Sequence, residues 1–371
     1  MKIRGAVLER VGAQTPFSQS RPLRICELDL ADPRANELLV RVEAAGVCHS
    51  DLSVLTGSRP RPLPMLLGHE AAGSVQRVGS RVDDIAPGTR VVMTFLPRCR
   101  DCAACDTAGR VPCPAGSAAN ADGVMLDGGR RLTHDGSTVH HHLGVSAFAT
   151  HIVVDRRSVV PVGDDVPAEV AAVLGCAVLT GGGAVLNVRA PVPGNTIAVV
   201  GLGGVGMAAL LVALAQRDCR VIGIDTLADK LDSARALGAD DVFTPAQAID
   251  NGVEADIVVE AAGHPRALET AIACTAVGGT TVTVGLPDPQ AQITLSPLRL
   301  TSRAHSLVGS YLGSADPARD IPRYERLWRE GRLPVERLIS SRIALDDINT
   351  AMDRLAGGNE IRQIITFGDD T

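Results

Sequence analysis

The chain has 371 residues, so a domain size of about 150 residues predicts two or three domains. Hydrophobic residues make up 45% and charged residues 21% of the chain, a mixture typical of a globular protein, which excludes a disordered chain. The 36 basic and 42 acidic side chains give a net charge of −6, and aromatic residues are only 2%, so we expect no nucleic-acid partner.

The amino-terminal half of the sequence predicts a β-rich domain inside the cell. Residues 1–5 (MKIRG) lack the apolar run of a secretory signal, so we expect a cytoplasmic protein. Before residue 178, short β-like runs such as Leu38–Val42 and Thr89–Met93 are separated by turns rich in glycine and proline. This pattern predicts a largely antiparallel, barrel-like β domain with irregular loops.

Three short motifs in this half carry candidate ligands for one metal ion: residues 46–51 (GVCHSD), 68–70 (GHE) and 175–177 (GCA). An isolated cysteine is more often a small buried hydrophobic residue than a ligand. Here, however, Cys48, His69 and Cys176 together supply one imidazole and two thiolates. Such a ligand set leaves one position of a tetrahedral zinc site open, as in catalytic zinc sites.

Four further cysteines form a compact cluster with the spacing C-x2-C-x2-C-x7-C: Cys99, Cys102, Cys105 and Cys113. Four thiolates on a loop with glycine and proline are typical of a closed zinc site, which has a structural role. A disulfide framework and an iron–sulfur cluster are the alternatives, but neither a signal peptide nor a small secreted size supports disulfides. A zinc ribbon that binds nucleic acid is disfavoured by the charge balance.

An uncharged stretch from Ala190 to Gln216 is long enough to cross a bilayer, but prolines and glycines interrupt it. We predict instead a buried strand at Thr196–Val200, a glycine turn and a buried helix from Met207, with no membrane partner. The turn reads G-x-G-x-x-G over residues 201–206. Its place between a strand and a helix is typical of a dinucleotide-binding site.

A second apolar run, residues 221–224, ends in Asp225, 19 residues after Gly206. An acidic side chain at the tip of this strand hydrogen-bonds the adenosine ribose in proteins that bind NAD. Further along, we expect helices at residues 229–237 and 266–274 and strands at residues 257–260 and 280–284. The alternation of strands and helices predicts a parallel, doubly wound sheet.

Together these motifs resemble the zinc-dependent medium-chain alcohol dehydrogenases, in particular the branch that contains the animal liver enzymes. The resemblance runs from residues 46–51 through the glycine motif to residues 361–363 (IRQ), and it covers nearly the whole chain. It implies an α/β protein with a GroES-like, barrel-like catalytic domain at residues 1–177 and 313–371. A Rossmann NAD-binding domain is implied at residues 178–312.

The resemblance also implies two zinc ions per chain. Cys48, His69 and Cys176 would bind the catalytic ion, and the four-cysteine loop would bind the structural one. Asp51 would hold the His69 ring through a hydrogen bond, as carboxylates commonly do for metal-bound imidazoles. Glu70 would lie behind the metal, and a buried, ion-paired structural acid is the alternative for this side chain.

Further site residues follow from the same resemblance. Ser50 would hydrogen-bond the substrate oxygen, and His49 would contact the cofactor pyrophosphate, with a merely exposed histidine as the alternative. The other residues that would contact NAD are Arg362 at the pyrophosphate, Asp225 and Lys230 at the ribose, the motif glycines Gly201, Gly203 and Gly206, and Thr180, Val205 and Val284 at the nicotinamide.

The residues that would line the substrate pocket are Phe95, His142, Leu286 and Tyr311. His142 stands in the place of a pocket-wall aromatic, but it belongs to the run His140–His142. For this run we expect a solvated loop rather than a third metal site. The liver-type proton relay ends in a histidine where this chain has Ser53. We therefore expect the proton to leave through water or through His49.

The implied reaction is a reversible hydride transfer from a primary or secondary alcohol to NAD+, giving an aldehyde or ketone, with zinc acting as a Lewis acid. Asp225 favours NAD over NADP, because its charge would repel a 2′-phosphate and no arginine at the next two positions would compensate for it. A zinc-free reductase of the same superfold would lack the ligand trio, and a non-enzymatic zinc-binding structural protein would keep every motif. The β-rich segment Ile293–Gly309 matches the family's subunit-pairing edge, so we expect a homodimer that acts on a small-molecule alcohol or aldehyde.

Overall fold

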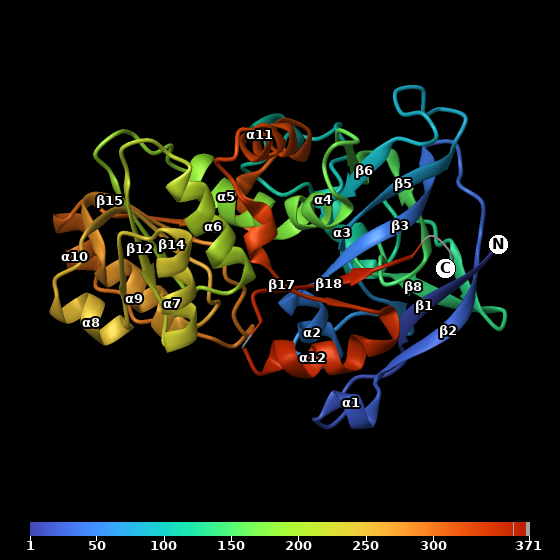
Figure 1. Cartoon of the computed structure of the whole chain (residues 1–371), viewed down its shortest axis with the longest axis horizontal. Helices are drawn as coiled ribbons and strands as arrows, with labels where there is room; N and C mark the ends of the chain where they lie inside the picture. Colours follow the sequence, from blue (N-terminus) through green and yellow to red (C-terminus); the bar gives the residue numbers. More distant parts are fainter. Residues whose placement is uncertain (359, 369–371) are drawn as a thin grey trace. The chain divides into compact units, whose positions relative to one another are not determined.

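The computed structural model describes residues 1–358 and 360–368, and the chain divides into two units (Figure 1). The first unit comprises Met1–Thr107, Pro112–Cys176 and Ile339–Thr371, and the second comprises Ala108–Val111 and Ala177–Leu338. The expected boundary near residue 177 is therefore present. Residues 313–338, however, pack with the second unit rather than with the first.

The strands of the first unit form a closed barrel in the order β1-β2-β7-β8-β4 and a second sheet in the order β10-β6-β5-β3-β18-β17, with β9 also paired to β3. The strand bounds are β1 Lys2–Leu8, β2 Leu23–Leu30, β3 Glu37–Val47, β4 Met65–Leu66, β5 Glu70–Val78, β6 Arg90–Met93, β7 Leu132–His134, β8 Ser137–His141, β9 His151–Asp155, β10 Val159–Pro161, β17 Ile339–Ile343 and β18 Arg362–Thr366. The helices are α1 Phe17–Ser20, α2 His49–Leu55, α3 Pro114–Asp122, α4 Ala168–Val173 and α12 Ile348–Ala356. The predicted β-rich, largely antiparallel domain is confirmed.

Strand β3 lies at the centre of the second sheet, where it pairs with β5, β9 and β18. Its sequence, ELLVRVEAAGV, is mostly apolar, which fits the burial of most of its side chains. The strand ends at Val47, so the next residue, Cys48, lies in the interior with 6% of its surface exposed. A central strand that pairs with three others thus places the first candidate metal ligand in the interior.

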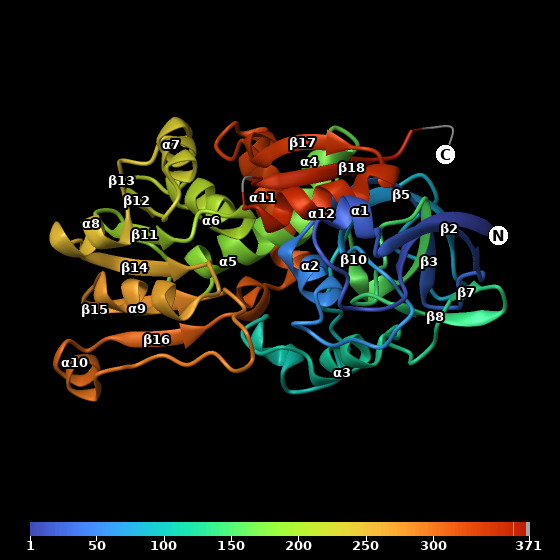
Figure 2. The same ribbon diagram turned by 90° about the horizontal axis from the view of Figure 1, so that it is seen from below.

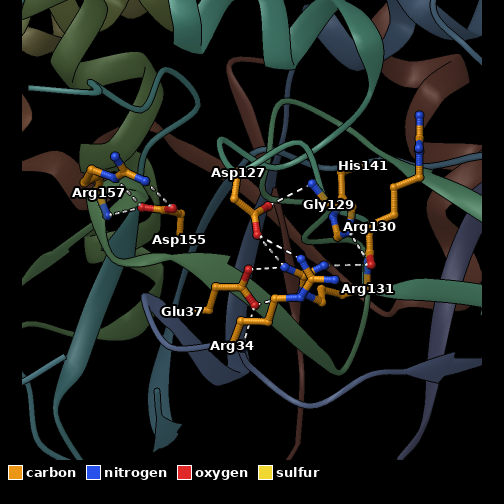
Figure 3. A network of polar contacts seen from close by, with 9 residues as sticks. All are labelled: Arg34, Glu37, Asp127, Gly129, Arg130, Arg131, His141, Asp155 and Arg157. Atoms are coloured by element: carbon orange, nitrogen blue, oxygen red, sulfur yellow. Dashed lines mark hydrogen bonds and ion pairs between the residues drawn. The ribbon is translucent and has the colours of Figure 1, made fainter. Parts of the chain in front are cut away.

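A buried ion pair between Arg131 and Glu37 ties the loop before β7 to the first residue of β3 (Figure 3). Both side chains are 2% exposed, and Arg131 Nε donates to Glu37 Oε2 over 2.8 Å. Arg131 also donates to Asp127 Oδ2 over 2.9 Å, and its backbone N–H donates to His141 Nε2 over 3.0 Å. The ion pair does not follow from a local sequence pattern, because its partners are 94 residues apart.

The second unit contains a parallel sheet in the order β13-β12-β11-β14-β15-β16, which can be followed in Figure 2. The strand bounds are β11 Thr196–Val200, β12 Arg220–Ile224, β13 Asp241–Phe243, β14 Ala255–Glu260, β15 Thr275–Thr283 and β16 Ser306–Gly309. The helices are α5 Leu179–Leu186, α6 Gly204–Leu214, α7 Ala228–Leu237, α8 Pro245–Asp250, α9 Pro265–Ala273, α10 Pro297–Ser302 and α11 Pro317–Arg329. The predicted Rossmann-type alternation is confirmed.

Packing against α5 explains why residues 313–338 belong to the second unit. Gly313 lies so close to this helix that a Cβ added to it would be 2.5 Å from the Leu179 carbonyl oxygen. Tyr324 of α11 is fully buried, and a Cβ added to Gly182 of α5 would be 2.8 Å from its hydroxyl oxygen. Small residues on α5 thus let the segment after β16 pack at close range.

The uncharged stretch 190–216 forms a loop, strand β11 and helix α6, as predicted. A different helical stretch, Ala168–Leu186, is long and apolar enough to cross a membrane by length and composition. However, 94% of its most apolar window is buried inside the protein, as in an ordinary core helix.

The segment Ile293–Gly309 is less β-rich than expected. Only residues 306–309 form a strand, β16, and helix α10 occupies Pro297–Ser302. The Ser296 hydroxyl caps this helix by accepting a hydrogen bond from the Arg299 N–H over 3.3 Å, and Pro297 occupies its first turn. These two start signals for a helix outweigh the β propensity of the flanking residues.

Candidate functional site

Cys48 lies at the junction of β3 and α2 and acts as the N-cap residue of the helix. Asp51, three residues later, accepts a hydrogen bond from the Cys48 backbone N–H through Oδ2 over 3.1 Å. The Cys48 side chain meets the backbone of the third helical residue in return, which completes a capping box. The thiol is therefore fixed by the start of the helix itself.

His69 follows a glycine whose conformation no other residue would easily adopt. Gly68 has φ = +92°, and a Cβ added to it would lie 2.5 Å from the Phe148 nitrogen. The turn places the His69 ring in the interior with 1% exposure. Its Nδ1 lies 3.2 Å from Asp51 Oδ1, so Nε2 is left to face the third candidate ligand.

Cys176 occupies a π-helical turn, Leu174–Val178, between α4 and α5. Its Sγ lies 3.6 Å from His69 Nε2, and the ligand atoms of Cys48, His69 and Cys176 all lie within 4.8 Å of one another. Ordinary zinc bond lengths and tetrahedral angles put a thiolate sulfur and an imidazole nitrogen about 3.5 Å apart. The three predicted ligands therefore come together in an arrangement that fits a zinc ion.

The electrostatics of this cluster differ between its two thiols, because the hydrogen bond with Cys48 and burial raise the pKa of Cys176 well above its ordinary value. The hydrogen bond from Cys176 holds the pKa of Cys48 well below its ordinary value. Deprotonated thiolates are the form of cysteine that binds metal. The cluster is buried, since Cys48, His69 and Cys176 are 6%, 1% and 5% exposed.

Asp51 organises this cluster, as predicted for it. Its Oδ1 accepts a hydrogen bond from the Gly68 N–H over 3.1 Å and contacts His69 Nδ1, while its Oδ2 accepts from Cys48. Burial alone would raise the pKa of Asp51, but the neighbouring imidazoles of His69 and His142 bring it below its ordinary value. The carboxylate thus stays charged and links the segments that carry two of the three ligands.

Glu70 and Arg362 form a second buried pair behind the ligands. Glu70 is fully buried at the start of β5, and Arg362 Nε lies 3.4 Å from Glu70 Oε1. Burial raises the pKa of Glu70 to about 7, against the opposing charge of Arg362. Gly46 makes room for the carboxylate, because an added Cβ would collide with it. The geometry matches the ion-paired alternative for Glu70.

The Arg362 guanidinium is directed into the first unit. It is 4% exposed and donates from NH1 to the Val47 carbonyl oxygen over 3.0 Å. Val47 is the residue before Cys48, so this contact supports the end of β3. A contact between Arg362 and a cofactor pyrophosphate stays a prediction.

The expectation of a solvated loop at His140–His142 is wrong for two of the three histidines. His141 and His142 are each 1% exposed. The His142 ring lies edge-on to His69 with a centroid distance of 5.3 Å, and its Nδ1 lies 3.1 Å from Asp51 Oδ1. Apolar neighbours on both sides, Val139 and Leu143, are the sequence signal that could have indicated burial.

Phe95 packs on the same ligand from another direction. Its ring lies edge-on to His69, with the centroids 5.6 Å apart, and it is 8% exposed. The two predicted pocket residues Phe95 and His142 are thus brought together around the His69 ring. Their contact with a substrate stays a prediction.

The predicted proton-transfer residues lie on the first turn of α2. Ser50 is partly exposed and His49 is exposed. The Ser53 hydroxyl donates to the His49 carbonyl oxygen over 2.9 Å. The Ser53 proton is therefore engaged within the helix, in keeping with an exit that does not pass through this residue.

The four predicted structural ligands also come together. The sulfur atoms of Cys99 and Cys105 are 3.8 Å apart and those of Cys102 and Cys105 are 3.6 Å apart, and all four cysteines form one cluster with Cys113. A tetrahedral zinc site with four thiolates has sulfur–sulfur distances of about 3.8 Å. Burial opposes ionisation of Cys113, but the N–H groups of Cys99 and Gly116 lower its pKa to about 6.

In the second unit the glycine motif connects β11 to α6. Gly201 has φ = +90°, and Gly206 lies so close to the Gly201 carbonyl that an added Cβ would collide with it. Gly203 is the N-cap residue of α6 and has open space around it. A tight turn, a close helix–strand approach and an open helix N-terminus are what a pyrophosphate-binding loop requires.

Asp225 follows β12, and its carboxylate accepts hydrogen bonds from backbone N–H groups of the glycine turn and of the segment before α7. Its Oδ2 accepts from the Leu202 N–H over 2.6 Å, and its Oδ1 accepts from the Leu227 N–H over 3.0 Å. The carboxylate is partly exposed, which leaves acceptor capacity for a ribose hydroxyl. Lys230 lies on α7 with 6% exposure.

The remaining predicted residues of the second unit differ in exposure. Thr180 and Val284 are 8% and 9% exposed, whereas Leu286 is 48% exposed. Val205 and Tyr311 are partly exposed. Their contacts with nicotinamide or substrate stay predictions.

A β-rich unit with a buried Cys2His ligand set, and a parallel-sheet unit with a dinucleotide-binding turn, define a zinc-binding dehydrogenase. Residues 34–164 match the alcohol dehydrogenase GroES-like domain, and residues 204–329 match the zinc-binding dehydrogenase domain. Alcohol dehydrogenase B of Mycobacterium tuberculosis is 33% identical over 381 aligned positions that cover the whole of both chains. The chain therefore belongs to the zinc-binding alcohol dehydrogenase family.

Two solved structures are similar over nearly the whole chain. The alcohol dehydrogenase zinc-binding domain protein from Burkholderia ambifaria is 31% identical, with a TM-score of 0.92 and 99% of each chain covered. Benzyl alcohol dehydrogenase from Acinetobacter calcoaceticus is 29% identical, with a TM-score of 0.90, and covers 99% of this chain and 100% of its own.

Proposed function

We propose that the protein catalyses reversible hydride transfer between a primary or secondary alcohol and NAD, with an aldehyde or ketone as the product. The observation that carries this proposal is the buried set of Cys48, His69 and Cys176, held in place by Asp51. A zinc ion bound by these side chains supplies a Lewis acid for the alcohol or carbonyl oxygen.

The chain's own groups would perform the proton transfer. Ser50 lies two residues after Cys48 on the first turn of α2, and we assign to its hydroxyl the acceptance of the alcohol proton. The Ser53 hydroxyl is engaged with the His49 carbonyl, so the next carrier is water or the exposed His49 side chain. General acid–base steps of this kind are typically worth about 10²–10⁴-fold in rate.

The cofactor we propose is NAD rather than NADP. The Asp225 carboxylate lies at the tip of β12, where the adenosine ribose binds in Rossmann-type domains. Its charge disfavours a 2′-phosphate, and residues 226 and 227 are Thr and Leu, which supply no compensating cation. Contacts of Thr180, Val205 and Val284 with the nicotinamide belong to the same proposal.

Three further properties are proposed with this function. We infer two zinc ions per chain, because both cysteine clusters have ligand atoms within 4.8 Å of one another. We infer a homodimer that pairs through β16, the edge strand of the parallel sheet, because Leu307 on this strand and Leu298 on helix α10 are 37% and 76% exposed. We also infer a cytoplasmic, liver-type enzyme.

The proposed function is tested by following NADH formation with a panel of primary, secondary, aromatic and acidic alcohols. Benzyl alcohol is included because a similar solved structure is a benzyl alcohol dehydrogenase. We expect turnover with NAD+ that is lost after chelation of zinc and in the variant Cys48→Ala.

Activity that resists both treatments would favour a zinc-free reductase. A folded, zinc-loaded protein without turnover on any alcohol or aldehyde would favour a non-enzymatic zinc-binding structural protein. Either result would contradict the proposed function.

A further inference from the structure

A buried carboxylate in the second unit lies where three neighbouring parallel strands end. Glu260 is the last residue of β14 and is 1% exposed. In the sheet register it lies opposite Val200, the last residue of β11, and opposite Thr283, the last residue of β15. A carboxylate is rarely buried this deeply unless its oxygens are hydrogen-bonded.

The Glu260 side chain accepts hydrogen bonds from the loop after β14 and from the end of β15. Its Oε1 accepts from the N–H groups of Ala262 and Gly263 over 2.9 Å and 2.7 Å. Its Oε2 accepts from the Thr283 hydroxyl over 2.7 Å. Hydrogen bonds to an ionised acceptor are roughly twice as strong as neutral ones. The carboxylate thus fixes the loop after β14 to the end of β15.

The backbone of Glu260 adds to the same connection. Its carbonyl oxygen accepts from the N–H groups of Val284 and Gly285 over 2.9 Å and 3.2 Å. A Cβ added to Gly285 would lie 2.8 Å from Glu260 Oε2 and 2.5 Å from Gly263 Cα. Residues 261–263 and 283–285 are therefore packed against each other with the carboxylate between them.

These two loops border the dinucleotide-binding turn. Strands β12 and β14 flank β11 on opposite sides, so the strand order reverses at β11. Open parallel sheets bind ligands at this switch point, at the carboxyl ends of the strands. The Ala261 N–H donates to the Val200 carbonyl oxygen over 2.9 Å, and a Cβ added to Gly201 would lie 2.6 Å from the Ala262 nitrogen.

We infer that Glu260 is a positioning residue for the cofactor: it holds residues 261–263 and 283–285 in the arrangement that NAD binds. This inference rests on the proposed cofactor. It adds a residue that acts on cofactor binding through the two loops that it holds. Loss of the carboxylate removes the acceptor of the Ala262 and Gly263 N–H groups and the partner of the Thr283 hydroxyl, which favours a rearrangement of the loops.

The experiment compares Glu260→Ala with Asp256→Ala. Asp256 lies near the opposite, amino-terminal end of the same strand, and its Oδ2 accepts from the Thr196 N–H over 2.8 Å. Both variants lose a carboxylate that anchors backbone, so both should lower the melting temperature. We expect Glu260→Ala to weaken NADH binding about tenfold or more, and Asp256→Ala to leave the dissociation constant unchanged. Zinc content should stay equal to that of the wild type in both.

Two conservative variants keep the test decisive if Glu260→Ala fails to fold. Thr283→Val removes only the hydroxyl that donates to Oε2 and keeps the shape of the side chain. Glu260→Gln keeps one carbonyl acceptor for the Ala262 and Gly263 N–H groups. We expect both to weaken NADH binding less than Glu260→Ala and to raise the KM for NAD more than they lower kcat.

The outcomes separate this inference from the proposed function. A wild type that binds no NADH would contradict the proposed cofactor. A wild type that binds NADH, with Glu260→Ala or, failing that, Thr283→Val at the wild-type dissociation constant, would overturn the role of Glu260 alone. Equal weakening by Glu260→Ala and Asp256→Ala would also overturn it, because the effect would then be a general loss of stability.

Discussion

At the scale of single residues, the buried pair of Arg131 and Glu37 gives a sharp prediction of stability. Removing one partner of a buried ion pair leaves an uncompensated charge in the interior. We expect Arg131→Ala to lower the free energy of unfolding by about 3–5 kcal/mol, measured by urea denaturation.

The matched control is Arg34→Ala. Arg34 NH1 lies 3.3 Å from Asp127 Oδ2, close to the same network, but the Arg34 side chain is 65% exposed. Exposed pairs contribute about 0–1 kcal/mol, so this variant should be almost as stable as the wild type. Equal losses in the two variants would contradict the account of the network in Figure 3.

His141 makes stability depend on pH. Burial lowers the pKa of His141 from 6.5 to about 3, and its Nε2 accepts the Arg131 N–H over 3.0 Å. The unfolded chain therefore takes up a proton below pH 6.5 that the folded chain refuses until about pH 3. The contribution of His141 is fully present above pH 6.5 and is lost as the pH falls toward 3.

We expect His141→Gln, which keeps an acceptor in place of Nε2 and does not titrate, to flatten this dependence. Between pH 6.5 and 5 the wild type should lose roughly 1.5 kcal/mol more than the variant, since one proton changes stability by about 1.36 kcal/mol per pH unit. Unfolding free energies of both proteins at several pH values provide the measurement. Parallel curves would rule out a neutral, buried His141.

Residue identity alone predicted the ligand trio and the four-cysteine cluster, because the chemistry of those side chains is specific, whereas the place of Asp51 came from the family resemblance. Residue identity failed for His141 and His142, whose polar run suggested solvent while apolar neighbours carried them into the interior. It also gave no sign of the contacts of Glu260, which depend on three strands far apart in the sequence.

At the scale of elements, Gly68 positions a ligand through the backbone of one turn. It combines φ = +92° with a close approach to Phe148, whose nitrogen would lie 2.5 Å from an added Cβ. We expect Gly68→Ala to displace His69, so that the purified protein carries about one zinc per chain instead of two and loses its activity.

Gly88→Ala is the control for this prediction. Gly88 has nearly the same φ, +91°, but nothing lies within 4 Å of an added Cβ. It should therefore show only the conformational cost, about 1 kcal/mol, and retain both zinc ions. Metal analysis together with thermal unfolding separates the two effects, and full zinc content in Gly68→Ala would refute the role of the close approach.

The strands and helices around the glycine motif were predictable, because the strand–turn–helix pattern is local. Helix α7, for example, ends at Leu237, the residue at which the predicted helix ends, and Gly238 with φ = +111° is its C-cap residue. No helix was predicted where α10 lies, although Ser296 and Pro297 supply a cap and a first-turn proline as start signals. In short segments such helix caps outweigh the intrinsic β propensity of the residues.

At the scale of the whole molecule, the sequence predicted two units of different architecture and the residue at which the first passes into the second. In the structure residues 313–338 pack with the second unit, through close approaches to α5 at Gly182 and Gly313 that no sequence motif marks. The proposed metal ligands lie in the first unit, and the proposed dinucleotide-binding turn lies in the second.

The central claim is that a catalytic zinc held by Cys48, His69 and Cys176 is distinct from a structural zinc in the four-cysteine loop. The most direct measurement is the zinc content per chain, together with alcohol oxidation, in the wild type, Cys176→Ala and Cys105→Ser. We predict two zinc ions in the wild type, and one in a folded, inactive Cys176→Ala. Cys105→Ser should lose thermal stability, because a closed site contributes folding free energy. One zinc ion in the wild type, or wild-type turnover in Cys176→Ala, would contradict the claim.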